Sequence, residues 1–237
     1  VLFRSGCRIT SPAVFGICAE NGAALVAEAN RIERPGSCGI RLIGVESADV
    51  RGCVIEGAPV AGVTASGGSA KVVLAGNTLD ACSVGLNDEG TAGLEITGNM
   101  VSGAMGHGIS LNASTAARVA GNTVTGVGGR GITVAGGDVE ITGNDIRNPA
   151  GFGVYVSSSA SDVVGNVIAG SGDCGMRLSG LEGIGVRDNV VTGSKSDGLR
   201  ISESTGLSLV GNEVRSADGC GMLFSRSEDC GVFRNTV

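Results

Sequence analysis

The chain has 237 residues with 42% hydrophobic content, which excludes a disordered protein, and its 43 glycines follow no Gly-X-Y period, which excludes collagen. The formal net charge of −6 argues against a nucleic-acid partner, whose binding surface would be basic. No run of apolar residues is long enough to cross a bilayer. We therefore expect neither a nucleic-acid partner nor membrane insertion.

A repeat of 22 to 24 residues runs from one end of the chain to the other. Its first mark is a corner position that holds asparagine in most units and cysteine in two early ones. The residue two places later is aliphatic in every unit, which chance does not produce. The corner position is filled by Cys7, Asn30, Cys53, Asn77, Asn99, Asn122, Asn144, Asn166, Asn189, Asn212 and Asn235.

A second column consists of glycines, each followed by an apolar residue. Another apolar position lies three residues before the corner position, so each unit supplies three short runs of alternating apolar and polar residues. Such alternation is typical of β-strands with one buried face. The glycines are Gly16, Gly39, Gly62, Gly85, Gly108, Gly131, Gly153, Gly175, Gly198 and Gly221.

Three strands in a unit this short cannot bury their own apolar face. Coiled into one turn, with each strand pairing onto the same strand of the next turn, they can. The sequence therefore predicts an all-β fold, a right-handed parallel β-helix with three short strands per coil and about ten coils of 22–24 residues. Eleven corner positions would span about 48 Å at strand spacing.

The asparagine column is expected to turn a corner of each coil. Asparagine tolerates the left-handed backbone conformation, and stacked amides can hydrogen-bond along the column. Cys7 and Cys53 fit that conformation less well, so altered corners are expected there. Replacing Asn144 by alanine should then destabilise the fold by about 1–2 kcal/mol.

We interpret residues 1–237 as a single β-helix domain, a fragment that lacks both end caps. The chain starts at a corner and ends at Val237, an inward aliphatic position of a strand. Unpaired strand edges at both ends predict self-association.

The columns described above resemble right-handed parallel β-helix repeat proteins of the pectin-lyase-like superfamily, over essentially the whole chain. That group includes pectin-degrading enzymes, mannuronan epimerases, phage tailspikes and a periplasmic protein of nitrous-oxide-reductase maturation. The even unit length looks most like bacterial β-helix repeat proteins exported by the twin-arginine route. The resemblance implies a secreted, periplasmic or cell-surface location, and no particular activity.

His107 is the only histidine and stands in a GHG element similar to that of polygalacturonases. Those enzymes also need an NTDG element and a pair of aspartates, because glycoside hydrolysis requires two carboxyl groups. Asp197 matches the first only in part and lies four coils away, and the aspartate pair is absent. We interpret His107 as one occupant of the variable position before the glycine, and assign no catalytic residue.

The strand after the glycine column offers a better candidate site. Arg177 and Arg200 hold its outward position in consecutive coils, and Tyr155 precedes them. Two interpretations stay open: a surface ion-pair network of little energetic value, or a shallow groove in which the arginines hold an acidic sugar beside the tyrosine. Pectin-type relatives bind substrate on this face, as the resemblance implies. The candidate residues are Tyr155, Arg177, Arg200, Asp173, Asp197 and Asp218.

Two functional classes follow. The first is a non-catalytic structural or surface-interaction module that contacts an acidic polysaccharide or cell-surface glycan weakly. The second is a lyase, hydrolase or epimerase of acidic glycans with this strand face as its substrate groove. Uniform short loops favour the first. So does the scarcity of aromatic residues, since Phe15, Phe152, Phe224 and Phe233 are expected to fill core or corner positions.

The eight cysteines include no C-x-x-C pair, so we expect neither zinc nor another metal, and no cofactor. Most are interpreted as small apolar fillers. A Cys220–Cys230 disulfide across a corner stays open as an alternative.

Overall fold

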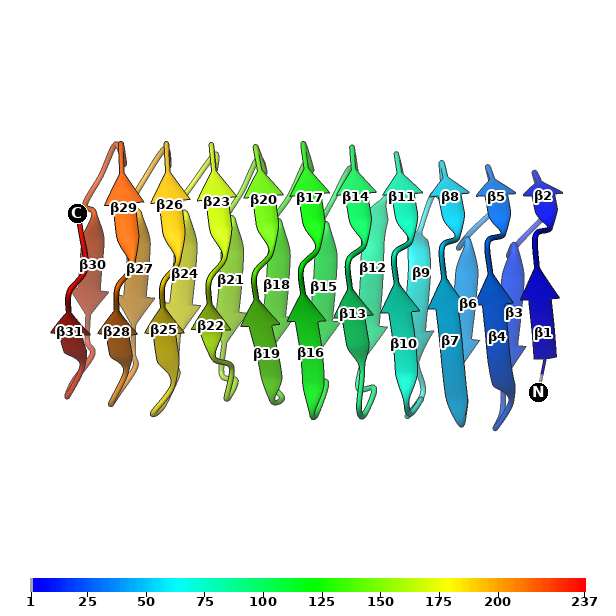
Figure 1. Ribbon diagram of the computed structural model, residues 1–237, viewed down its shortest axis with the longest axis horizontal. Coiled ribbons are helices and arrows are strands. Elements are labelled where there is room, and N and C mark those ends of the chain that lie inside the picture. Colours follow the sequence, from blue (N-terminus) through cyan, green and yellow to red (C-terminus); the bar gives the residue numbers. More distant parts are fainter. Residues whose placement is uncertain (1) are drawn as a thin grey trace.

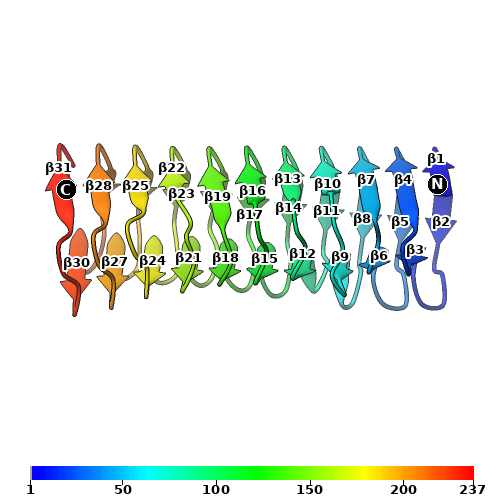
Figure 2. The same cartoon turned by 90° about the horizontal axis from the view of Figure 1, so that it is seen from below.

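The computed structural model describes residues 2–237, and these residues form a solenoid of 31 short strands in three long parallel sheets (Figure 1). The two ends of the chain lie at opposite ends of the solenoid (Figure 2). No helix within residues 2–237 is long and apolar enough to span a membrane.

Each coil contributes one strand to each sheet, and we name the sheets A, B and C. Sheet A contains β1 (Leu2–Ser5), β4 (Ala24–Glu28), β7 (Ser47–Arg51), β10 (Val72–Ala75), β13 (Glu95–Thr97), β16 (Ala117–Ala120), β19 (Val139–Thr142), β22 (Val163–Val164), β25 (Gly185–Arg187), β28 (Ser208–Val210) and β31 (Gly231–Phe233). Sheet B contains β2 (Arg8–Thr10), β5 (Arg31–Glu33), β8 (Val54–Glu56), β11 (Thr78–Asp80), β14 (Met100–Ser102), β17 (Thr123–Thr125), β20 (Asp145–Arg147), β23 (Val167–Ala169), β26 (Val190–Thr192) and β29 (Glu213–Arg215). Sheet C contains β3 (Ile17–Glu20), β6 (Ile40–Ile43), β9 (Ala61–Ser66), β12 (Val84–Glu89), β15 (Ile109–Asn112), β18 (Ile132–Ala135), β21 (Val154–Ser157), β24 (Met176–Ser179), β27 (Leu199–Ser202) and β30 (Met222–Ser225).

Every strand pairs in parallel with the same strand of the neighbouring coil, so equivalent residues stack in columns. Ile132, for example, lies opposite Ile109 on one side and Val154 on the other. The predicted right-handed parallel β-helix, with three strands per coil and about ten coils, is confirmed.

The core consists of the apolar columns identified in the sequence. Alternate residues of each strand point inward, and Ile132, Val134, Ile141 and Ile146 are fully buried within a single coil. Because parallel strands stack identical positions, aliphatic residues pack on aliphatic residues along the whole axis, and one continuous cluster results.

The glycine column exists because there is no room for a side chain at the start of each sheet C strand. A Cβ atom on Gly131 would lie 2.4 Å from the Ile146 side chain and 2.6 Å from the carbonyl oxygen of Gly153. The Ile146 side chain and the Gly153 backbone of the next coil therefore pack directly against the backbone of Gly131.

The asparagine column forms the predicted hydrogen-bonded ladder. The Oδ1 atom of Asn144 accepts hydrogen bonds from the backbone N–H and the side-chain amide of Asn122, at 3.0 and 2.9 Å. Its Nδ2 donates to the carbonyl oxygen of Val119 and to Oδ1 of Asn166. The side chain of Asn144 is buried, so it satisfies polar groups that water cannot reach.

The expectation that asparagine itself takes the left-handed conformation is wrong. The residue before each corner position has the positive φ in all eleven coils, and this residue is usually a glycine, such as Gly143 with φ 59°. The asparagine is needed for its amide, because a buried corner leaves backbone groups that only a donor and acceptor together can satisfy.

Cysteine interrupts the ladder, as expected. Cys53 is buried between Asn30 and Asn77, and its thiol lies 3.8 Å from the Asn30 amide. A sulfur is a weak acceptor, so the corner at Asn30 is held less firmly than its neighbours. Cys7 occupies the same position in the first coil and is exposed.

Candidate functional site

The residue two places after each glycine of the glycine column points outward from sheet C, and these residues stack in one column along the solenoid, which we call the sheet C column. The register places them side by side in the predicted order, and Arg177 lies directly opposite Arg200. The column reads Cys18, Arg41, Thr64, Asn87, Ser110, Thr133, Tyr155, Arg177, Arg200 and Leu223.

An arginine–aromatic cluster, made of Arg130, Phe152, Tyr155 and Arg177, lies near the middle of this face. The Phe152 and Tyr155 rings stack with centroids 5.8 Å apart. The guanidinium of Arg130 lies over both rings, 4.1 Å from the Tyr155 centroid, and that of Arg177 lies 5.5 Å from the Phe152 centroid. Two cations therefore share one aromatic platform.

Neither arginine of the cluster forms a salt bridge within residues 2–237, whereas Arg118 on sheet A and Arg147 on sheet B are both paired with carboxylates. Within the described residues the guanidinium of Arg130 donates only to the Thr133 hydroxyl, at 3.3 Å. The Nε of Arg177 is buried and has no hydrogen-bond partner in the described chain. A ligand cannot reach that buried Nε, but the terminal N–H groups of both guanidinium groups have no anionic partner in the described residues, and a carboxylate is the partner they match best.

Arg200 differs from Arg177, although the two are neighbours. Its Nε donates to Oδ2 of Asp197 at 2.7 Å, and this hydrogen bond raises the pKa of Arg200. Asp197 is buried and also accepts the backbone N–H of Cys220. Arg200 is therefore already neutralised, which matches the ion-pair interpretation at this one position.

The other two predicted aspartates lie away from the arginines' N–H groups. Asp218 pairs with Lys195 at 3.5 Å, and Asp173 accepts the backbone N–H of Cys174. Of the six predicted site residues, the structure brings Tyr155 and Arg177 together in the cluster, and joins Asp197 to Arg200.

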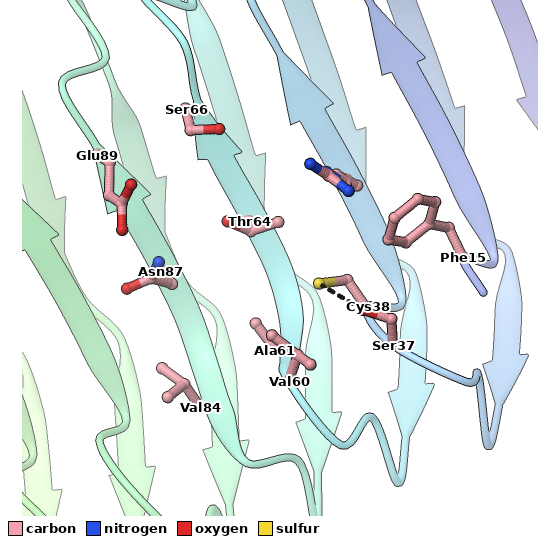
Figure 3. Close-up of a pocket in the computed structure, with 11 residues that line it drawn as sticks. Phe15, Ser37, Cys38, Val60, Ala61, Thr64, Ser66, Val84, Asn87 and Glu89 are labelled. Atoms are coloured by element: carbon pink, nitrogen blue, oxygen red, sulfur yellow. Dashed lines mark hydrogen bonds between the residues drawn. The ribbon is translucent and has the colours of Figure 1, made fainter.

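A groove of about 430 Å³ opens on the same face nearer the N-terminus, and we call it the Phe15–Arg41 groove (Figure 3). Its floor comes from β6, β9 and β12. The guanidinium of Arg41 lies 4.8 Å from the Phe15 ring centroid and has no salt bridge in residues 2–237. Thr64 and Asn87 line the middle, and Glu89 stands at the far side. Sequence reasoning missed this groove.

The expectation that the phenylalanines fill core or corner positions is wrong for Phe233, which lies exposed on β31, whereas Phe15 and Phe152 do lie at corners. Both are half-buried residues just before sheet C strands, and both carry an arginine over the ring. Phe224 packs against the core, and Phe233 is 61% exposed. The sequence did contain a signal for these arginine–aromatic contacts. Phe15 and Phe152 both stand directly before a glycine of the glycine column, next to the outward residues of sheet C.

His107 lies one coil before Arg130 on this face. Its Nδ1 accepts the backbone N–H of Arg130 at 3.0 Å, so the proton of the neutral ring is assigned to Nε2. Burial, and then the charge of Arg130, lower the pKa of His107 below its usual value. The ring is therefore neutral at physiological pH.

Metal ligation has little support in this donor set. Residues 2–237 contain no group of three or more histidine, cysteine, aspartate and glutamate side chains placed to hold an ion. All eight cysteines are free, so the Cys220–Cys230 disulfide is not formed. Burial raises the pKa of Cys53, Cys82 and Cys174, which favours the protonated thiol over the metal-binding thiolate.

Comparison with known families agrees with this architecture. The family model described as "Right handed beta helix region" matches residues 107–237, and that described as "Periplasmic copper-binding protein (NosD)" matches residues 5–168. Each match covers more than half of the chain. The chain belongs to the right-handed β-helix proteins and, within them, carries a NosD-family region. Among curated proteins no significant match is found.

Several solved structures share the fold. The periplasmic alginate epimerase AlgG, in a doubly substituted form, matches with a TM-score of 0.67 and 13% identity, over 99% of this chain and 69% of that one. Another AlgG structure is covered over 61% of its length. The A-module of a mannuronan C-5 epimerase from Azotobacter vinelandii gives 0.53 and 14%, over 99% of this chain and 88% of that one. An α-1,3-glucanase catalytic unit from Streptomyces thermodiastaticus gives 0.54 and 10%, over 96% and 64%. At these identities the likeness shows the fold alone.

Proposed function

We propose that this chain is a non-catalytic, glycan-binding β-helix module of an exported protein, and that its sheet C column binds an acidic polysaccharide. The observation that carries the proposal is the set of three arginines on this face, Arg41, Arg130 and Arg177, which lack a carboxylate partner in residues 2–237 and lie over aromatic rings. Each offers free N–H donors to an anion.

The chemistry of this arrangement suits a sugar carboxylate. A guanidinium packed flat on an aromatic ring keeps its edge exposed, and that edge can form two parallel hydrogen bonds to a carboxylate. The rings beside it offer an apolar surface to the C–H face of a sugar. The face is long and shallow, which suits a polymer better than a small molecule.

The net charge of −6 does not oppose this partner. Exposed charges separated by more than about 8 Å are largely screened at physiological ionic strength, so the local arginines decide the interaction. An exported setting is supported by the description of the NosD family as periplasmic and by the periplasmic epimerase among the solved structures. The two neighbours named as epimerases are an alginate epimerase and a mannuronan C-5 epimerase.

Calorimetric titration with size-defined acidic and neutral oligosaccharides tests the proposal. The acidic ligand should bind and the neutral one should bind far more weakly, with an affinity that falls as salt is added. Losing one charge-assisted contact of about 1.5–3 kcal/mol corresponds to roughly ten- to hundredfold, so Arg41→Ala and Arg177→Ala should each weaken binding to that extent.

Arg118→Ala and Arg147→Ala are the matched controls, because these arginines are exposed and already paired on sheets A and B. They should leave the affinity within about twofold, since surface ion pairs contribute little. Equal affinity of the sheet C variants and the unmodified chain would refute the proposal.

The NosD family is described as copper-binding, but the donor set of this chain does not fit copper. Copper selects thiolate, thioether and imidazole ligands. The described residues place no three histidine, cysteine or carboxylate side chains around a common point, and the pKa of three buried thiols is raised.

A second candidate, a lyase or epimerase of acidic glycans, is favoured by one observation. His107, Arg130 and Tyr155 lie in three consecutive coils of the sheet C face, and the first two are joined by a hydrogen bond. Removing a proton next to a sugar carboxylate requires a group that neutralises the carboxylate and groups that move protons. Arg130 would supply the first. The Tyr155 oxygen would have to accept the proton as a phenolate, and the Nε2–H of neutral His107 would return one.

Incubation with polyuronates separates the two candidates. A lyase would produce an unsaturated sugar that absorbs in the ultraviolet, and an epimerase would exchange the C5 hydrogen with deuterated solvent. We expect neither signal above that of a His107→Gln, Tyr155→Phe variant. Turnover that disappears in this variant would establish the second candidate instead.

A further inference from the structure

Cationic positions are sparse along the sheet C face. Arg41 lies on the second strand of the sheet, Arg130 just before the sixth and Arg177 on the eighth. At a strand spacing of about 4.8 Å these positions are separated by about 19 Å and about 10 Å. Arg200 on the ninth strand is neutralised by Asp197 and adds no free cation.

Between the first two arginines the face carries short neutral side chains. Thr64, Asn87 and Ser110 follow Arg41 in register, one in each coil. Their hydroxyl and amide groups donate and accept hydrogen bonds and carry no charge. Beside them stands Glu89, an exposed carboxylate with no salt bridge in residues 2–237. The Phe15–Arg41 groove thus holds one cation, one anion and neutral polar groups between them.

We infer that the ligand is a heteropolysaccharide in which uronic acid residues are separated by neutral sugars, and not a homopolymer of uronic acid. This inference rests on the proposed function. One carboxylate binds Arg41 beside Phe15, another binds Arg130 and Arg177 at the aromatic platform, and neutral sugars lie over Thr64, Asn87 and Ser110.

A homopolyuronate carries a carboxylate on every sugar, so an extended chain running along the solenoid would place several over the neutral stretch. There the carboxylates would lose part of their hydration without gaining a cation, which is unfavourable. One of them would also approach Glu89, a like charge. Neutral sugars instead offer hydroxyl groups, which amide and hydroxyl side chains can pair, and one of those hydroxyls can donate to Glu89.

The test uses the whole chain and three oligosaccharides of equal length: a homo-oligouronate, a neutral oligomer, and an oligomer in which single uronates alternate with blocks of three neutral sugars, one for each of Thr64, Asn87 and Ser110 (the alternating oligomer). Titration calorimetry should give an affinity for the alternating oligomer about tenfold higher than for the homo-oligouronate. Equal or tighter binding of the homo-oligouronate would overturn the inference and leave the proposed function intact. Failure of both acidic oligomers to bind would overturn the proposed function itself.

Glu89→Gln provides a second readout that does not depend on the folding of a damaged chain, because the residue is exposed and pairs with no charge in the described residues. Removing the like charge should raise the affinity for the homo-oligouronate several-fold and change that for the alternating oligomer less than twofold. Glu140→Gln, an exposed glutamate on sheet A, is the control and should change neither. An unchanged homo-oligouronate affinity in Glu89→Gln would count against the inference.

Discussion

Each asparagine of the ladder joins neighbouring coils through side-chain hydrogen bonds. The Asn144 side chain makes four hydrogen bonds, and all four lie in the core. Replacing it by alanine leaves the backbone N–H of Asn122 and the carbonyl oxygen of Val119 without these partners. At about 1–3 kcal/mol for each of these two unsatisfied groups, Asn144→Ala should lower the free energy of unfolding by about 2–6 kcal/mol, which is more than the roughly 1–2 kcal/mol expected from the sequence.

Chemical denaturation followed by circular dichroism measures this change. Glu140→Ala in the preceding strand is the control, because its pair with Arg118 is exposed and should matter by less than about 0.5 kcal/mol. If the two variants unfolded alike, the ladder would not stabilise the fold.

Cys53 offers the reverse experiment. An asparagine at this position would complete the ladder between Asn30 and Asn77, and its Nδ2 could donate to the carbonyl oxygen of Ala27, which the thiol now contacts at 3.5 Å. Cys53→Asn should therefore stabilise the chain by about 1 kcal/mol. Cys82→Asn, a buried cysteine outside the ladder, should destabilise it. Thermal unfolding of the two variants gives the comparison, and stabilisation by neither would contradict the role assigned to the ladder.

His107 predicts a pH dependence of stability. Its pKa is lowered in the folded chain, first by burial and then by Arg130, while in the unfolded chain it lies near 6.5. The unfolded state thus takes up a proton more readily, so stability is complete above about pH 6.5 and falls as the pH drops below it. The melting temperature of the unmodified chain should fall more between pH 7.5 and 5.5 than that of His107→Gln. Parallel curves would show that the ring is not held neutral.

Sequence reasoning at this scale found the asparagine column but not the conformation of its members. The constant spacing identifies the corner position, but it does not show which residue of the corner takes the positive φ. In the Asn144 corner that residue is Gly143, and in the Asn189 corner it is Asp188. The repeat therefore predicts which residues form the corner better than it predicts the backbone conformation and hydrogen bonds of each one.

At the scale of the element, the glycine column sets the close approach of sheet C to the core. Gly131→Ala would force a Cβ against Ile146 and the backbone of Gly153, and overpacking of this kind costs about 1–3 kcal/mol. Gly143 has open space around its Cβ and a positive φ, so Gly143→Ala costs about 1–2 kcal/mol through the backbone alone.

Asparagine substitutions separate these two causes. Asparagine tolerates positive φ, so Gly143→Asn should recover much of the stability lost in Gly143→Ala. At Gly131 the larger side chain should be worse than alanine. Denaturant titration of the four variants checks this order, and recovery by asparagine at Gly131 would show that steric packing is not the cause.

Strands and registers were predictable because a two-residue alternation repeated at a fixed period leaves one pairing that buries every aliphatic column. The sheet C column was predicted for the same reason, and Arg177 and Arg200 do lie side by side. The partners of these arginines could not be predicted. Asp197 forms a salt bridge with Arg200 and none with Arg177. The difference depends on the direction of the Asp197 side chain in its corner, which the repeat pattern does not specify.

In the whole molecule, ten coils build the sheet C face, and its function depends on which side chains the coils place there. Arg118 on sheet A and Arg147 on sheet B are balanced by carboxylates, whereas Arg41, Arg130 and Arg177 on the sheet C face have no salt bridge in the described residues. Arg41 and Phe15 belong to different coils, as do Arg177 and Phe152. These contacts join different coils, so the sequence of a single repeat does not predict them.

Binding of an acidic glycan to the sheet C face can be seen directly in a crystal structure of the chain with a uronate-containing oligosaccharide. We expect the sugar chain to lie along sheet C, with one carboxylate on Arg41 beside Phe15 and another between Arg130 and Arg177. An oligosaccharide bound to sheet A or sheet B, with these three arginines unoccupied, would contradict it.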